Sequence, residues 1–169
     1  LNLKSKKQPR KKNYAVFLDE NFASHPDLKR NKRLRLHNIK PKKYYSDMKR
    51  FFNFYSKNFN VKIKIAAHPS SKKNYFGKFK MMTYKTSELV KNASIVILHQ
   101  STSLSYPVLF RKKILFVTSN EINKSYISQK IFSLSKFFYN KPLNIDTELN
   151  IDQIKRCTIF YSNKYNKFK

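Results

Sequence analysis

Two stretches of the sequence, Val61-Lys-Ile-Lys-Ile-Ala-Ala-His-Pro-Ser-Ser71 and Ser94-Ile-Val-Ile-Leu-His-Gln-Ser-Thr-Ser103, decide the expected fold. Each begins with a short apolar run rich in β-branched residues and ends in polar turn formers, which is the pattern of a strand leading into a loop. In open α/β sheets, ligands bind beyond the carboxyl ends of the strands. We therefore expect the His, Ser and Thr side chains after these two strands to line one anion-binding crevice.

Apolar runs of strand length alternate along the chain with segments of helical spacing, which is typical of α/β proteins with a parallel sheet. The predicted strands cover residues 14–18, 61–67, 94–98 and 114–117, and the predicted helices cover residues 44–59, 86–91, 103–110, 124–138 and 151–161. We predict one Rossmann-like α/β domain with a doubly wound, mainly parallel sheet over residues 13–163. A basic linker or tail at 1–12 precedes it, and a basic C-terminal tail at 164–169 follows it.

Two of these segments carry information about burial. The aromatic residues of the predicted helix at 44–59 recur at helical spacing, which favours a core-facing stripe over a platform for stacking bases. In the strand at 61–67, Lys62 and Lys64 alternate with apolar residues. We expect this strand to lie at an edge of the sheet or to be partly covered on one face.

The composition is strongly basic, with 37 Lys and Arg residues against 9 Asp and Glu residues and a formal net charge of +28 over 169 residues. Such a charge favours polyanionic partners, among them nucleic acid, an anionic membrane surface and phosphorylated ligands. The chain is also rich in Lys, Asn, Ile, Phe and Tyr, whose codons are A/T-rich, so codon bias is an alternative explanation. The sequence leaves both explanations open.

The scarcity of glycine and cysteine excludes several kinds of site. Gly77 is the only glycine, so neither a Walker loop nor a G-x-G-x-x-G turn is present, and hydroxyls, imidazoles and helix N-termini must hold any phosphate. Cys157 is the only cysteine, which argues against a disulfide framework and fits a reducing compartment. Because acidic residues are few and no Asp-x-Asp cluster occurs, we expect neither a metal nor a cofactor.

The polar residues after the two strands suit an anion. A histidine side chain titrates near neutrality, so His68 can donate to a phosphate oxygen or protonate a leaving phosphate, and Pro69 restricts the backbone after it. Ser101-Thr102-Ser103 begins a predicted helix, where free N–H groups and the helix dipole favour an anion. The structural alternatives are a satisfied loop histidine at His68 and a buried strand-end residue at His99.

The order of these motifs resembles a known family. Ala66-Ala-His-Pro69, Thr86-x-Glu88-Leu89-Val90 and His99-x-Ser-Thr-Ser103, followed by a Lys-Ile-Leu-Phe strand, are similar to the C-terminal nucleotide-sugar domain of bacterial GT-B-fold sialyltransferases and polysialyltransferases of surface (capsular) polysaccharide biosynthesis. The resemblance covers roughly residues 14–117 and implies one half of a GT-B fold. Its N-terminal partner domain would lie outside this sequence, which begins with Leu1.

The resemblance also implies roles for individual residues. In that family, the histidine of the His-Pro motif contacts the CMP phosphate and helps the leaving group depart. A hydroxyl pair, here Ser101-Thr102 or Thr102-Ser103, holds the same phosphate. The implied nucleotide and phosphate site comprises His68, Pro69, Thr86, Glu88, Ser101, Thr102 and Ser103.

Asp19-Glu20-Asn21 resembles the acidic motif of the family, with Asn where the family has Gly. Asn tolerates positive φ better than other non-glycine residues, so the turn can be kept. The resemblance implies Asp19 or Glu20 as the general base, beside His68 as the third catalytic residue. In polysialyltransferases this pair lies in the other domain, so the alternative is a strand-end carboxylate that caps a turn or pairs with lysines.

We therefore expect a glycosyltransferase, or its donor-binding domain, that transfers sialic acid or a similar acidic sugar from a CMP donor to a surface polysaccharide or lipooligosaccharide. The expected partners are the nucleotide-sugar donor, the glycan acceptor and an anionic membrane surface. No stretch has the apolar length of a transmembrane helix and no signal peptide precedes the fold, so we expect a cytoplasmic protein, peripheral at the inner face of the bacterial membrane. Two alternatives stay open: a basic nucleic-acid-binding protein and a non-catalytic relative of the transferase.

Overall fold

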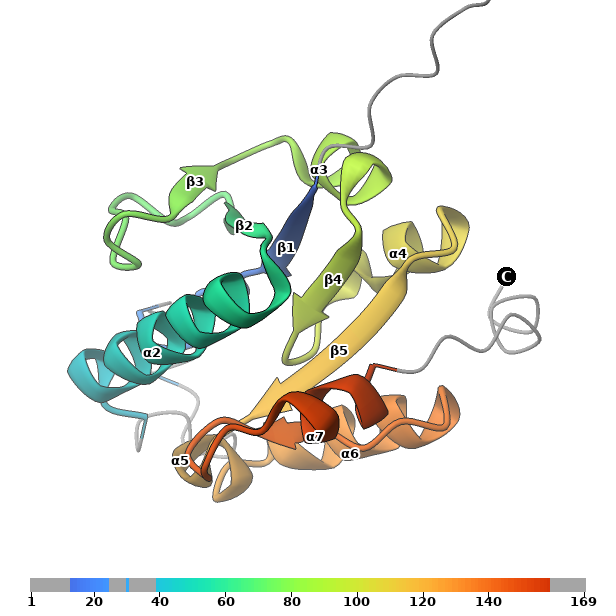
Figure 1. The fold of residues 1–169 in the computed structure, drawn as a ribbon. Helices are drawn as coiled ribbons and strands as arrows, with labels where there is room; N and C mark the ends of the chain where they lie inside the picture. Colours follow the sequence, from blue (N-terminus) through green and yellow to red (C-terminus); the bar gives the residue numbers. More distant parts are fainter. Residues whose placement is uncertain (1–12, 25–29, 31–38, 159–169) are drawn as a thin grey trace, which may run out of the picture.

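The computed structural model describes residues 13–24, 30 and 39–158, and a parallel sheet forms the centre of this part (Figure 1). The strands are β1 (Tyr14–Leu18), β2 (Lys62–Ala66), β3 (Lys80–Met82), β4 (Ile95–Leu98), β5 (Lys113–Thr118) and β6 (Leu143–Asn144). Their order is β3-β2-β1-β4-β5-β6, and every pairing is parallel. This is the strand order of the Rossmann sheet, so the predicted fold class is confirmed.

Helices cover both faces of the sheet, as the two faces of β1 show. Phe17 points to one face, where the centroid of its ring lies 5.3 Å from the ring centroid of Phe52 in α2 (Pro41–Phe59). Tyr14 points to the other face, where its hydroxyl donates to the Leu89 carbonyl of α3 (Thr86–Asn92) at 2.8 Å. The remaining helical segments are η3 (Thr102–Leu104), α4 (Ser105–Leu109), α5 (Asn120–Asn123), α6 (Ile127–Phe137) and α7 (Ile151–Arg156).

The aromatic stripe of α2 is part of the core, as its spacing predicts. The buried residues of this helix are Tyr44, Tyr45, Met48, Phe51, Phe52 and Tyr55. Burying one such side chain contributes about 2–3 kcal/mol to folding, so the stripe holds α2 firmly on the sheet. Pro41 stands in the first turn, where its missing N–H costs nothing, and Asn60 ends the helix in the left-handed region at φ 49°.

The position of β2 decides between the two alternatives for its lysines. β2 is not an edge strand, because it lies between β1 and β3. Partial cover explains the alternating lysines instead: Lys62 is exposed, whereas Lys64 is half-buried with its Nζ 3.9 Å from the centroid of the Tyr14 ring. A lysine on this face is stabilised by its apolar stem and by the negative face of the aromatic ring.

Several element boundaries also differ from the sequence prediction. The strands β3 and β6 were not predicted, because runs of three and two residues show no periodicity. The predicted helix at 103–110 is a 3₁₀ turn followed by α4, and the predicted helix at 124–138 begins three residues later, as α6. The closing helix ends at Arg156. The predicted tails at 1–12 and 164–169, and the domain's last residues, 159–163, lie outside the described residues.

Candidate functional site

The carboxyl ends of the strands meet at one edge of the sheet, and the strand order reverses beside β1. The chain passes from β1 to β2 and β3 on one side and then returns to place β4 on the other side. Ligands bind outside such a switch point in sheets of this kind. Leu18 pairs in register with Ala66 and with Leu98, so Asp19 lies between the segments that follow β2 and β4. We call the edge of the sheet at which Asp19, His68 and residues 101–103 follow their strands the switch-point crevice.

The acidic motif and the His-Pro loop contact each other across the crevice. The Asp19 carboxylate accepts a hydrogen bond from the Asn21 N–H at 3.0 Å, and Asn21 adopts φ 55°. Asn21 therefore occupies a left-handed position of the kind that glycine adopts most readily. The Asn21 side-chain amide then donates to the Ser70 hydroxyl at 3.3 Å, which links the loop after β1 to the loop after β2.

The Asp19 carboxyl has an unusual pKa. Its pKa is raised from 3.8 to about 7: burial is the largest cause, the Asn21 N–H lowers the pKa, and the nearby charge of Glu20 raises it. The Ser71 hydroxyl lies close enough to lower it as well, although the buried Ser71 Oγ makes no hydrogen bond of good geometry. A carboxyl group that titrates near neutrality can accept and release a proton at physiological pH. Asp19 is thus a buried group that exchanges its proton near neutral pH, and Glu20 beside it is half-exposed.

His68 is held by the loop that follows it. Its Nδ1 accepts the Ser70 N–H at 3.2 Å and lies 2.7 Å from the Ser70 hydroxyl. Because a backbone N–H can only donate, Nδ1 carries the lone pair, and the proton of the neutral ring is on Nε2. The same Ser70 hydroxyl contacts Asn21, so His68 and the acidic motif share one hydrogen-bonded connection. Pro69 is exposed on this loop.

His99 is a structural residue and not part of the open crevice. Its side chain is 1% exposed, its Nδ1 donates to the Val117 carbonyl at 2.8 Å, and its Nε2 accepts from the Tyr44 hydroxyl at 3.0 Å. Burial lowers the pKa of His99 to about 4, so the ring is neutral. Of the two readings that the sequence left open, the buried strand-end residue is the one observed. The imidazole ties α2 to β4 and β5.

The hydroxyl cluster after β4 divides into a capping residue and two more accessible ones. Ser101 is buried and caps the η3 turn, because its Oγ accepts the Ser103 N–H at 3.0 Å. Thr102 is exposed and Ser103 is half-buried. The turn η3 has only three residues, so the hydroxyls, more than a helix dipole, are what this segment offers to an anion.

Thr86 and Glu88 lie away from the crevice. Burial raises the pKa of Tyr14, the first residue of β1, and the charge of Glu88 raises it too, so Glu88 lies near the amino end of that strand. Figure 1 shows α3 beside this end, whereas the switch-point crevice is at the carboxyl end. Thr86 is the first residue of α3 and not its N-cap; Lys85 occupies that position without a side-chain capping bond. The structure thus joins the loops after β1 and β2 through the Asn21–Ser70 hydrogen bond and places residues 101–103 after the adjacent strand β4, whereas it places Thr86 and Glu88 elsewhere.

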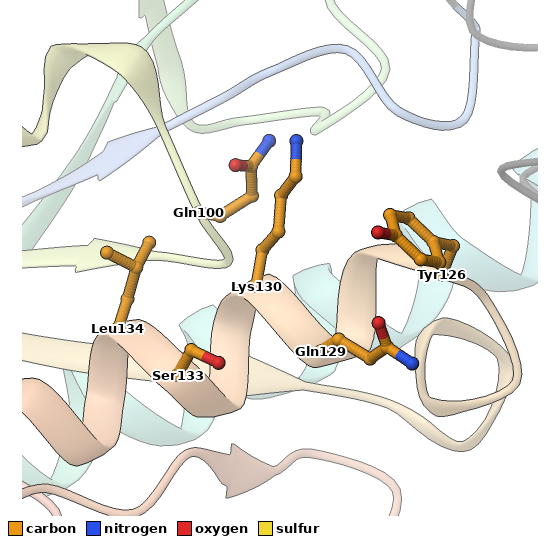
Figure 2. Close-up of a pocket in the computed structure, with 6 residues that line it drawn as sticks. All are labelled: Gln100, Tyr126, Gln129, Lys130, Ser133 and Leu134. Atoms are coloured by element: carbon orange, nitrogen blue, oxygen red, sulfur yellow. The ribbon is translucent and has the colours of Figure 1, made fainter.

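An open cleft, which the sequence did not predict, adjoins the loop after β4. It has a volume of about 390 Å³ and lies between Gln100 on one side and α6, with the turn that precedes this helix, on the other. The other lining residues are Tyr126, Gln129, Lys130, Ser133 and Leu134 (Figure 2). Figure 2 shows the polar ends of Gln100 and Lys130 directed into the same space. The spacing of three to four residues between positions 126, 130 and 133 was the available signal, since it places them on one face of the predicted helix.

Two absences characterise the described residues. No group of three or more His, Cys, Asp or Glu side chains among them is arranged to hold a metal ion. None of their helices combines the length and the apolar character that crossing a membrane requires.

Comparisons with known proteins support the fold. No protein-family model matches the chain, and no curated protein matches it. Among solved structures, the chain is similar to one described as the glycotransferase of kitacinnamycin, with a TM-score of 0.50 and 7% identity. The match covers 96% of this chain and 40% of that one, so this chain spans less than half of the length of that protein. At this identity the likeness shows the fold alone, a Rossmann-like α/β arrangement.

Proposed function

We propose that this chain is the nucleotide-sugar-binding domain of a glycosyltransferase. Its donor is a CMP-linked acidic sugar, such as sialic acid, and its acceptor is a glycan of a surface polysaccharide or lipooligosaccharide. The motifs quoted above support the choice of donor, and the glycosyltransferase-like fold supports the class. The basic surface would hold the protein near anionic lipid at the inner face of the membrane.

One observation carries the proposal: a buried carboxyl with a pKa of about 7 lies at the switch point and is connected to an imidazole. Asp19 reaches His68 through Asn21 and the Ser70 hydroxyl, and both lie at the edge where sheets of this order bind ligands. Residues that only stabilise a turn do not need a carboxyl with so high a pKa, because an amide would form the same hydrogen bond without the cost of burying a charge.

The proposed reaction is a displacement at the anomeric carbon. The acceptor oxygen forms a bond to this carbon while the bond from the carbon to the donor phosphate oxygen breaks, and the electron pair leaves with CMP. Asp19 takes the proton of the acceptor hydroxyl. His68 donates a hydrogen bond from its Nε2–H to the departing phosphate, which leaves with the electron pair, and the hydroxyls of Thr102 and Ser103 donate hydrogen bonds to the same group. Because active sites of GT-B enzymes lie between two domains, this domain alone would bind the nucleotide without transferring the sugar.

Calorimetric titration with CMP, UDP and a mixed-sequence oligonucleotide at physiological salt tests the proposal. We expect the chain to bind CMP in preference to UDP. His68→Ala is expected to weaken CMP binding about tenfold or more, since a hydrogen bond to a charged group contributes about 1.5–3 kcal/mol. Asn53→Ala changes an exposed residue of α2, far along the helix from the crevice loops, and serves as the control with unchanged affinity.

Three results would contradict this function or one of its parts. Normal CMP binding by folded His68→Ala protein would remove the histidine from the site. Tight oligonucleotide binding that weakens steeply with salt, without binding of CMP, would show instead that the charge of +28 serves nucleic acid. Normal CMP binding without transfer by the complete protein would identify the non-catalytic relative.

A further inference from the structure

The cleft beside α6 is not explained by the phosphate-binding residues. It lies between Gln100 and one face of α6, with Tyr126 from the turn before the helix (Figure 2). Gln100 stands directly between His99 and Ser101 in the chain, so the cleft adjoins the hydroxyl cluster of the switch-point crevice. A volume of about 390 Å³ is within the range of ligand sites, which starts at roughly 300 Å³.

The lining of the cleft is chemically selective. Gln100, Gln129 and Ser133 supply two carboxamides and a hydroxyl, which can both donate to and accept from the hydroxyls of a sugar. Tyr126 is half exposed and presents an aromatic ring, a surface on which the C–H groups of a sugar ring pack. These groups suit a polyhydroxylated ligand better than an apolar one.

Lys130 is the charged residue of the cleft, and it bears on the charge of the ligand. It is exposed, its side chain extends toward Gln100 in Figure 2, and no carboxylate of the cleft faces it, because the lining residues include neither Asp nor Glu. Among the described residues, the ion pairs involve other lysines. A cation in a polar hollow without an acidic partner favours a ligand with a negative charge.

We propose that this cleft is a binding subsite for an anionic saccharide, with Lys130 as the residue that selects for the negative charge. This inference rests on the proposed function for its place beside a nucleotide site, but its own evidence is the lining of the cleft. The shared chemistry, a sugar ring bearing a carboxylate, can come from the donor sugar or from an acidic unit of the acceptor glycan.

Binding measurements with matched ligands separate these sources. The donor arm compares CMP-N-acetylneuraminic acid with CMP, and the acceptor arm compares the methyl glycoside of N-acetylneuraminic acid with its uncharged methyl ester. Lys130→Gln is expected to weaken binding of the charged sugar about tenfold in at least one arm and to leave CMP binding unchanged. Lys136→Gln is the matched control, because it removes the same charge from an exposed position of α6 outside the cleft. It should change these affinities less than twofold.

The outcomes distinguish this inference from the proposed function. Equal effects of Lys130→Gln and Lys136→Gln, no effect of either, or equal affinity for the acid and its methyl ester would each overturn the subsite. Normal CMP binding together with such a result would leave the proposed function standing. Failure of the wild-type chain to bind CMP, with Lys130-dependent binding of the charged methyl glycoside, would overturn the proposed function and support the subsite.

Discussion

Replacing Asp19 by Asn should stabilise the protein at neutral and alkaline pH. The carboxyl is 5% exposed, and burial raises its pKa from 3.8 to about 7. A raised pKa means that the folded protein binds this proton more tightly than the unfolded chain does. The stability of the wild-type protein therefore falls as the pH rises from about 4 to 7, since the charged form is disfavoured by burial.

The size of the effect follows from the two pKa values. At about 1.4 kcal/mol for each tenfold change in proton affinity, a rise from 3.8 to about 7 costs about 4 kcal/mol above pH 7. Asn keeps an oxygen that can accept the Asn21 N–H, so the turn after β1 is retained. Asp19→Asn removes the buried charge and should raise the free energy of unfolding by about 2–4 kcal/mol at pH 8.

Urea denaturation at a series of pH values from 4 to 8 measures this difference. The gain of Asp19→Asn over the wild type should be close to zero at pH 4 and should grow up to pH 7, where it becomes constant. Glu148→Gln, at an exposed loop position, is the control and should shift stability by less than about 0.5 kcal/mol throughout. A gain that does not depend on pH, or a loss of stability at pH 8, would refute the argument from burial.

Three further predictions concern residues around the crevice. Tyr44→Phe leaves the Nε2 of buried His99 without its hydrogen-bond donor and should lower the free energy of unfolding, measured by urea denaturation, by about 1–3 kcal/mol. An unchanged denaturation midpoint would show that this hydrogen bond does not stabilise the fold. Asn21→Ala should cost about 1–2 kcal/mol in the same assay because its φ is 55°, whereas Asn21→Gly should cost less, and the reverse order would contradict the turn geometry. Burial lowers the pKa of His99 from 6.5 to about 4, so the unfolded chain binds this proton more tightly than the folded protein. In the Asp19→Asn background, the free energy of unfolding should therefore fall as the pH falls from 6.5 to about 4. A free energy that stays constant over this range would contradict the burial of His99 as a neutral ring.

Many residues of the switch-point crevice could be predicted, because their positions depend on the spacing of apolar and polar residues over short stretches of the chain. The apolar run of β1 ends at Leu18 as expected, and the polar residues after β1, β2 and β4 lie where strand ends must meet in a parallel sheet. Asn21 in the left-handed region is likewise a local property, since only a few side chains tolerate that backbone conformation.

What needed the tertiary structure are the properties that arise from contacts between distant residues. The neutral state of His99 depends on its burial, which lowers its pKa, and its tautomer depends on the Val117 carbonyl and on the Tyr44 hydroxyl, 55 positions away. Glu88 lies near the amino end of β1, away from the crevice, because α3 spans only about 10 Å and packs beside Tyr14.

The sequence by itself determined the α/β class, the strand ends that carry polar side chains and the absence of glycine-rich phosphate loops, because each follows from composition or from residue spacing. Only the tertiary structure decided that Asp19 is buried enough to titrate near neutrality and that a cleft forms between Gln100 and α6. The physical reason is the same for both. The desolvation of a carboxyl group and the shape of a cleft depend on which segments pack together, and the spacing of residues along the chain does not show which distant segments will do so.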